Sequence, residues 1–156
     1  MLESTAAHFT VVIATLAALA ACVLLQYESL IFVWRRLSAH GGHRRVKVLY
    51  AICSVILLHA AEIMIFGTVL WLLARWPAAG GLAGEHVGRF FDYMYFSAVT
   101  FSTVGFGDIA PLGAIRFLAG TEALTGFVLI TWSASFTYLE MEKFWRAEEM
   151  DERKME

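Results

Sequence analysis

One short stretch of the chain has the residue types needed to cage a cation with backbone oxygens: Thr103-Val104-Gly105-Phe106-Gly107-Asp108. A dehydrated cation needs several oxygen ligands at once, so successive carbonyl groups must turn toward one axis. Only unusual backbone angles allow this, and Gly105 and Gly107 reach them without a side-chain penalty. Val104 and Phe106 then pack away from the axis, and the Thr103 hydroxyl adds one more oxygen. The stretch predicts a site for a permeant cation.

Three long apolar runs must position this stretch, and they cover residues 9–34, 46–73 and 117–138. Each is long enough to cross a bilayer, which takes about 20 apolar residues in a helix. The composition agrees, because 59% of the 156 residues are hydrophobic and 17% are charged, too apolar for an ordinary soluble domain. We therefore expect an all-α membrane protein with three transmembrane helices.

The region between the second and third runs contains a loop and a helix-sized segment that is too short to span. Residues 77–84 are rich in Gly and Ala and predict a flexible loop. Residues 90–102 are apolar and lead directly into the cation stretch, which favours a re-entrant half-helix. Non-helical backbone at membrane depth is tolerated only inside protein or beside water, so one chain cannot close the cage. The expected architecture is a ring of subunits with a re-entrant pore helix and filter loop.

Basic residues beside the spans predict the orientation of the chain. The first connection carries Arg35, Arg36, Arg44, Arg45 and Lys47 with no acidic residue among them. Such a loop stays in the cytoplasm and suits the negative surface of the cell membrane. Residues 1–8 carry no Lys or Arg, so we expect the N-terminus outside and, after three spans, the C-terminus in the cytoplasm.

The expected organisation has three parts. Residues 1–45 form an additional N-terminal transmembrane helix and the basic loop, and residues 46–139 form a pore domain. Residues 140–156 form a charged cytoplasmic tail whose alternating acidic and basic residues offer helical i,i+4 pairs.

The sequence Ser97-Ala98-Val99-Thr100-Phe101-Ser102 followed by residues 103–108 resembles the pore loop of the potassium channel superfamily. The wider layout resembles short bacterial members of the two-transmembrane, pore-loop ion channel family that carry an additional N-terminal helix. Two further stretches bear the likeness, His59-Ala60-Ala61-Glu62-Ile63 and Glu122-Ala123-Leu124-Thr125-Gly126. The resemblance covers about residues 46–140 and implies a tetramer that conducts K⁺ through residues 103–107, which we expect to be a homotetramer.

The resemblance also implies supporting residues and shows two departures from the family pattern. Tyr95 and Asp108 resemble the aromatic and acidic pair that hydrogen-bonds behind the outer mouth of the filter. Phe106 stands where the commonest filters have Tyr, and so lacks a hydroxyl that could brace the filter. Val99 stands where some bacterial channels place a Glu, so inactivation controlled by that Glu should be absent or different.

The third span is expected to line a cavity below the filter. By the same resemblance Gly126 falls where inner helices often bend, and close helix packing is the equal alternative for a glycine there. Phe127, Ile130 and Ala134 share one helix face, which we assign to the cavity and gate.

Ionisable side chains inside the spans are rare and usually functional, and here they are Glu28, His59, Glu62 and Glu122. His59 and Glu62 are three residues apart and can meet on one helix face. A hydrogen-bonded clasp between helices is the favoured role. A proton sensor is the alternative, because the pKa of histidine is ordinarily near 6.5. Two such ligands are too few for a structural metal site.

Other function classes find little support. A net charge of −2 offers no basic surface for nucleic acid. No nucleophile, base and orienting group stand at catalytic spacing, so we expect no enzyme and no cofactor besides the permeant K⁺.

Cys22 and Cys53 lie in apolar runs and are expected to be buried free thiols. The competing functions are a less selective monovalent cation channel and a non-conducting regulatory membrane subunit.

Overall fold

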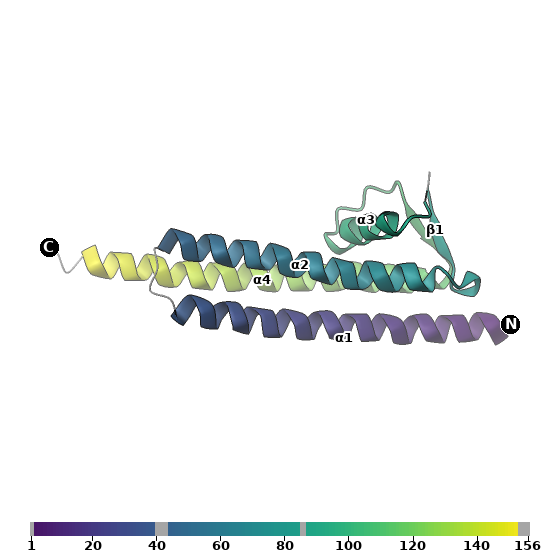
Figure 1. The fold of residues 1–156 in the computed structure, drawn as a ribbon, viewed down its shortest axis with the longest axis horizontal. Helices are drawn as coiled ribbons and strands as arrows, with labels where there is room; N and C mark the ends of the chain where they lie inside the picture. Colours follow the sequence, from purple (N-terminus) through teal and green to yellow (C-terminus); the bar gives the residue numbers. More distant parts are fainter. Residues whose placement is uncertain (1, 40–43, 85–86, 153–156) are drawn as a thin grey trace.

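The computed structural model describes residues 2–39, 44–84 and 87–152 and is dominated by three long, roughly parallel helix axes (Figure 1). The long helices are α1 (Leu2–Ala39), α2 (Arg44–Leu73) and α4 (Arg116–Glu152). They contain the three stretches that are long and apolar enough to span a membrane, Thr5–Ser38, Val46–Leu73 and Gly113–Lys143. The protein is an all-α membrane protein, as predicted.

The chain ends are arranged as three successive crossings require. The N-terminal end of α1 lies beside the end of α2, whereas the start of α2 and the C-terminal part of α4 lie at the opposite end (Figure 1). α1 packs against both α2 and α4 along this length. Which end faces the cytoplasm stays a prediction, as does the three-part division at residues 45 and 139.

The short helix α3 (Phe90–Phe101) lies between the second and third long helices in the chain and contacts both of them. Its 12 residues make a helix about 18 Å long, well below the roughly 30 Å of a bilayer core. It begins where Asp92 Oδ2 accepts hydrogen bonds from the backbone N–H of Gly88 and Arg89, at 2.9 and 2.7 Å. It ends just before Thr103, so it delivers the chain to the predicted filter.

Residues 77–84, predicted to be a flexible loop, instead contain two short elements of secondary structure. After the 3₁₀ turn η1 (Pro77–Ala79), strand β1 (Gly81–Ala83) pairs antiparallel with β2 (Ala110–Leu112), which precedes a second 3₁₀ turn, η2 (Gly113–Ile115). A Cβ at Gly80 would lie 1.9 Å from the Leu112 carbonyl oxygen, so this glycine permits a close approach. The prediction was wrong because three-residue strands show no readable period and depend on a distant partner. The pairing brings together the two ends of the segment that contains α3 and the filter.

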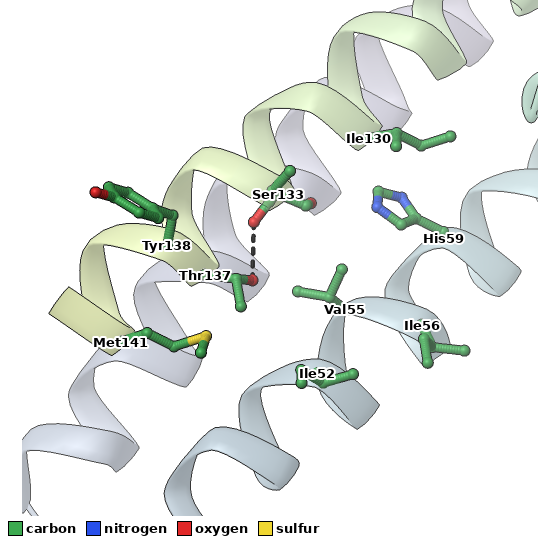
Figure 2. A pocket seen from close by; sticks show the side chains of 10 residues that line it. Ile52, Val55, Ile56, His59, Ile130, Ser133, Thr137, Tyr138 and Met141 are labelled. Carbon is green, nitrogen blue, oxygen red and sulfur yellow. Dashed lines mark hydrogen bonds between the residues drawn. The ribbon is translucent and has the colours of Figure 1, made fainter. Parts of the chain in front are cut away.

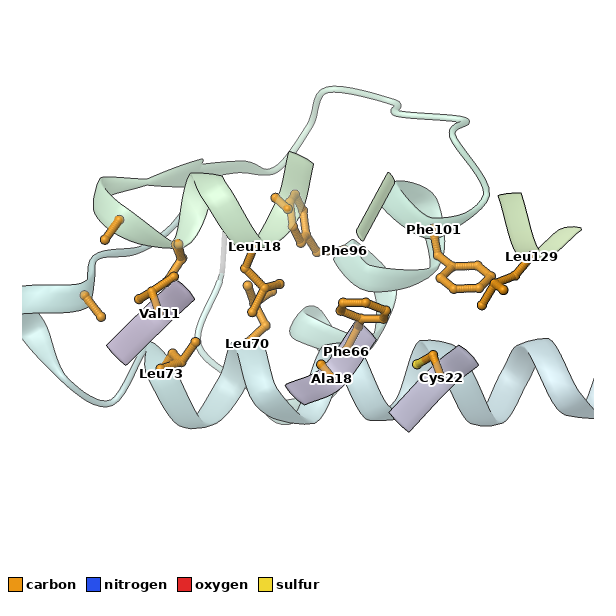
Figure 3. Packing of buried hydrophobic residues seen from close by; sticks show 14 residues of the cluster. Val11, Ala18, Cys22, Phe66, Leu70, Leu73, Phe96, Phe101, Leu118 and Leu129 are labelled. Carbon is orange, nitrogen blue, oxygen red and sulfur yellow. The ribbon is translucent and has the colours of Figure 1, made fainter. Parts of the chain in front are cut away.

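The core lies where all four helices meet (Figure 3). It joins Val11, Ala18 and Cys22 of α1, Phe66, Leu70 and Leu73 of α2, Phe96 and Phe101 of α3, and Leu118 and Leu129 of α4. Many other large apolar side chains on the long helices are exposed, as lipid-facing helices require.

The two cysteines differ in environment. Cys22 is buried in the core, as predicted, and Cys53 is exposed, which corrects the prediction. The reason is that an apolar residue in a membrane helix faces lipid as readily as protein, so its type alone does not reveal burial.

The charged tail continues α4 as far as Glu152, which confirms a helical extension over the described residues. Lys143 pairs with Glu140, and Arg146 Nη2 lies 2.6 Å from Glu142 Oε1. Residues 153–156 of the predicted tail lie outside the described residues.

Candidate ion-conduction site

The backbone of the predicted filter alternates between two kinds of angle. Thr103, Gly105 and Gly107 have φ values of 59°, 55° and 79°, and Thr103 is the only non-glycine residue with a positive φ in the described part of the chain. Val104 and Phe106 separate them without a positive φ. Left-handed angles at every second position do not occur in an ordinary strand, whose residues have negative φ. The segment therefore has an irregular backbone, as the predicted filter requires.

Hydrogen bonds tie this segment to the end of α3. The backbone N–H groups of Ser102, Thr103 and Gly105 donate to the carbonyl oxygens of Ala98, Thr100 and Val99, at 3.1, 3.0 and 3.1 Å. The last bond holds the middle of the filter against the helix that precedes it. A positive φ costs a residue with a Cβ about 1–2 kcal/mol. The hydrogen bonds to the end of α3 hold Thr103 in this conformation.

Asp108, at the C-terminal end of the predicted filter, is held by Tyr95 of α3. The Tyr95 hydroxyl donates a 2.8 Å hydrogen bond to Asp108 Oδ2, so the structure brings together the pair that the resemblance implied. This bond raises the pKa of the Tyr95 phenol above its ordinary value. On the other side, a Cβ at Gly84 would lie 2.8 Å from the Asp108 carbonyl oxygen, so the segment after β1 also packs closely here.

α3 fits between α2 and α4 because glycines face it. A Cβ at Gly67 of α2 would lie 2.5 Å from Met94 Cε and 3.2 Å from Ser97 Cβ. A Cβ at Gly126 of α4 would lie 2.0 Å from the Phe101 carbonyl oxygen and 2.9 Å from Phe101 Cα. Close packing is thus one observed role of Gly126, and a bend of α4 at this residue stays a prediction.

The face of α4 that we assigned to the cavity is not covered by other parts of the same chain. Phe127 is 59% exposed and Ile130 is 37% exposed, and Ala134 is exposed on the same side of α4. Ile130 and Ala134 border a groove of about 410 Å³ between the first half of α2 and the second half of α4 (Figure 2). His59 of α2 faces Ser133 across one end of this groove.

The four ionisable residues inside the spans differ in their hydrogen-bond partners. His59 Nδ1 lies 2.7 Å from Glu62 Oε2 on the same helix, while Glu122 contacts the Ser97 hydroxyl of α3. Glu28 is exposed and lines a separate groove between α1 and α2. Glu62 and Glu122 are completely buried, and the roles of all four as clasp or sensor stay predictions.

Two connecting residues were not singled out from the sequence. Ser97 lies between α2 and α4, and Gln26 of α1 is fully buried, with its Nε2 donating to Ser133 Oγ at 2.8 Å and to the Leu129 carbonyl at 3.2 Å. A glutamine in the middle of an apolar run is a signal for such a link, because an amide in a span needs partners.

Comparison with known proteins places these features in a family. Residues 58–142, more than half of the chain, match the sequence profile of a family described as "Ion channel". This is the two-transmembrane ion channel family of the potassium channel superfamily. The chain belongs to this ion channel family. The match begins beside His59 and takes in α3, the filter segment and the membrane-spanning part of α4. α1 lies outside it, so the ion channel core is joined here to an additional helix.

Two curated relatives of this ion channel chain share a shorter region. Protein LctB of Geobacillus stearothermophilus is 36% identical over 53 residues, which cover 34% of this chain and 40% of that protein. Protein LctB of Bacillus caldotenax is 32% identical over 53 residues with the same coverage. The chain thus spans 40% of the length of these relatives. No solved structure matches it.

Proposed function

We propose that this ion channel chain is a subunit of a potassium-selective channel, which conducts K⁺ passively through a tetrameric filter. The observation that carries the proposal is the alternation of left-handed backbone angles at Thr103, Gly105 and Gly107. Carbonyl oxygens turned to one side replace the hydration shell of a permeating ion. The Thr103 hydroxyl would add the innermost ligand.

Exposed apolar side chains support assembly into a ring. Val104 is 55% exposed and Phe106 is 70% exposed, although both lie beside a polar ion path. Copies of the chain around one axis would cover these side chains while the carbonyl groups face inward. The family resemblance implies a tetramer, and we propose a homotetramer in the cell membrane. The basic residues of the first connection support an N-terminus outside and a C-terminus in the cytoplasm.

One feature favours a second candidate, a less selective monovalent cation channel. Phe106 lacks the hydroxyl that the commonest filters carry at this position, so the filter loses one possible brace. The third candidate is a non-conducting regulatory subunit that retains the fold.

The reversal potential of the reconstituted protein, with K⁺ on one side and Na⁺ on the other, distinguishes the three candidates. Gly105→Ala is the control, because a Cβ there meets no atom within 4 Å but conflicts with a φ of 55°. A potential near the potassium equilibrium value that is lost in Gly105→Ala would support the proposal. A potential near zero would favour the less selective channel, and absence of current at every pH and voltage would favour the regulatory subunit.

A further inference from the structure

The Ser97 hydroxyl of α3 lies between two oxygen atoms, one from α2 and one from α4. Ser97 Oγ is 2.9 Å from the Ile63 carbonyl oxygen of α2 and also makes a hydrogen-bond contact with Glu122 Oε1 of α4. Ser97 and Glu122 are both 0% exposed. One side chain of α3 therefore touches both helices that enclose it.

The number of protons in this group is limited. A serine hydroxyl donates one hydrogen, a backbone carbonyl only accepts, and an ionised carboxylate only accepts. If Glu122 were ionised, the Ser97 hydroxyl would be the only donor for two acceptors, the Ile63 carbonyl oxygen and Glu122 Oε1. One of these two oxygen atoms would then contact Ser97 Oγ without a full hydrogen bond. Both contacts are satisfied when Glu122 contributes a proton of its own.

The surroundings of Glu122 also disfavour a charge. Glu122 has no ion pair among the described residues, and its Oε2 is buried without a hydrogen-bond partner in the same part of the chain. The titratable groups near it are the Cys22 thiol of α1, which interacts electrostatically with Glu62 and Glu122, and Glu62 itself, which is paired with His59. A buried carboxylate without a cation is costly in a membrane protein.

We propose that Glu122 is a neutral carboxylic acid that donates to Ser97 Oγ, while Ser97 donates to the Ile63 carbonyl, and that this relay positions α3. Glu122 is a positioning residue, since it touches α3 and no filter residue. The packing makes α3 sensitive to the relay, because Gly67 and Gly126 leave no free space around Ser97 and Phe101. The effect on ion selection rests on the proposed function, whereas the protonation state of Glu122 does not.

Infrared spectroscopy of the full-length protein in lipid tests the protonation state. We expect a carboxylic-acid carbonyl band at neutral pH that is absent from Glu122→Gln and retained in the matched control Glu62→Gln. In Ser97→Ala the band should shift, because the acid loses its acceptor. A wild-type spectrum without a band that depends on Glu122 or Ser97 would overturn the proposal, and this readout needs no ion current.

Conduction tests the positioning role. Glu122→Gln keeps an N–H donor for Ser97, so the ratio of K⁺ to Na⁺ permeability should stay within about twofold of the wild-type ratio. Glu122→Met has a similar size and no donor, so the ratio should fall about tenfold or more. Equal ratios in the two variants would refute the positioning role. If the wild-type protein carries no current, the proposed function fails while the infrared result still decides the state of Glu122.

Discussion

The Tyr95 hydroxyl on α3 donates a 2.8 Å hydrogen bond to Asp108 Oδ2, across the 13 positions that separate them in the chain. This bond connects the middle of α3 to the C-terminal end of the predicted filter. Tyr95→Phe removes it while keeping the ring, so we expect a lower ratio of K⁺ to Na⁺ permeability and a faster decline of current during recording. Tyr93→Phe, the same change two residues away, is the matched control. Similar currents from Tyr95→Phe and wild type would show that the bond does not brace the filter.

The same bond predicts how alkaline pH acts on the filter. The hydrogen bond to Asp108 raises the pKa of Tyr95, since deprotonation of the phenol would lose it. An unperturbed tyrosine titrates near pH 10, so the stabilising contribution is complete below about pH 10 and is lost only as pH rises through the higher folded-state pKa. Permeability ratios measured from pH 7 upward should therefore stay constant to about pH 10. A loss that began near pH 8 and disappeared in Tyr95→Phe would contradict this assignment.

Gly126 and Gly120 provide a matched pair on α4. A Cβ at Gly126 would lie 2.0 Å from a backbone oxygen of Phe101, whereas a Cβ at Gly120 meets nothing within 4 Å. We expect Gly126→Ala to lower the free energy of unfolding by about 3 kcal/mol, because the added methyl group would overlap a backbone atom of Phe101. Gly120→Ala should be neutral or stabilising by up to about 1 kcal/mol. Thermal unfolding in lipid nanodiscs compares them, and a stable Gly126→Ala protein with altered open probability would support a hinge instead.

Asp92 predicts a dependence on acid at the start of α3. Hydrogen bonds from the backbone N–H groups of Gly88 and Arg89 stabilise the carboxylate and lower the pKa of Asp92. Its contribution to stability is therefore present above the unfolded pKa of about 3.9 and is lost as pH falls through the lower folded-state value. The melting temperature of the wild type should approach that of Asp92→Asn below about pH 4. Parallel curves for the two proteins from pH 3 to pH 7 would rule out this role.

Gln26 and Ser133 should be energetically coupled. Gln26 Nε2 donates to Ser133 Oγ at 2.8 Å, which joins the additional helix α1 to α4 within the family core. A double-mutant cycle with Gln26→Leu and Ser133→Ala should give a coupling of about 0.6 kcal/mol, typical of side-chain hydrogen bonds between membrane helices. Unfolding free energies in lipid provide the four values. A coupling of zero would mean that packing alone holds α1 against α4.

Local pattern and composition were sufficient to predict the three spans and the short helix between the second and third of them. The apolar runs predicted α1, α2 and α4, because a bilayer requires about 20 consecutive apolar residues in each crossing helix. The segment that leads into Thr103 predicted a helix too short to cross, and α3 occupies residues 90–101. The His59–Glu62 contact also followed from spacing, since residues three apart share a helix face.

Contacts between segments far apart in the chain could not be predicted from the sequence. The pairing of β1 with β2 corrected the flexible loop expected at residues 77–84, and the exposure of Cys53 corrected its expected burial. Spacing alone also left Gly126 undecided between a hinge and packing. These features depend on which helix faces meet, and apolar residues face protein and lipid alike.

The sequence by itself determined that this chain is a three-span membrane protein, and it placed two glycines where the backbone has positive φ. Only the tertiary structure decided that Ser97 joins α2 to α4, that Gln26 binds α4, and that α3 fits against Gly126. The physical reason is that spans and glycine spacing are local properties of the chain. Hydrogen bonds and close approaches between helices depend instead on how the helices turn relative to one another.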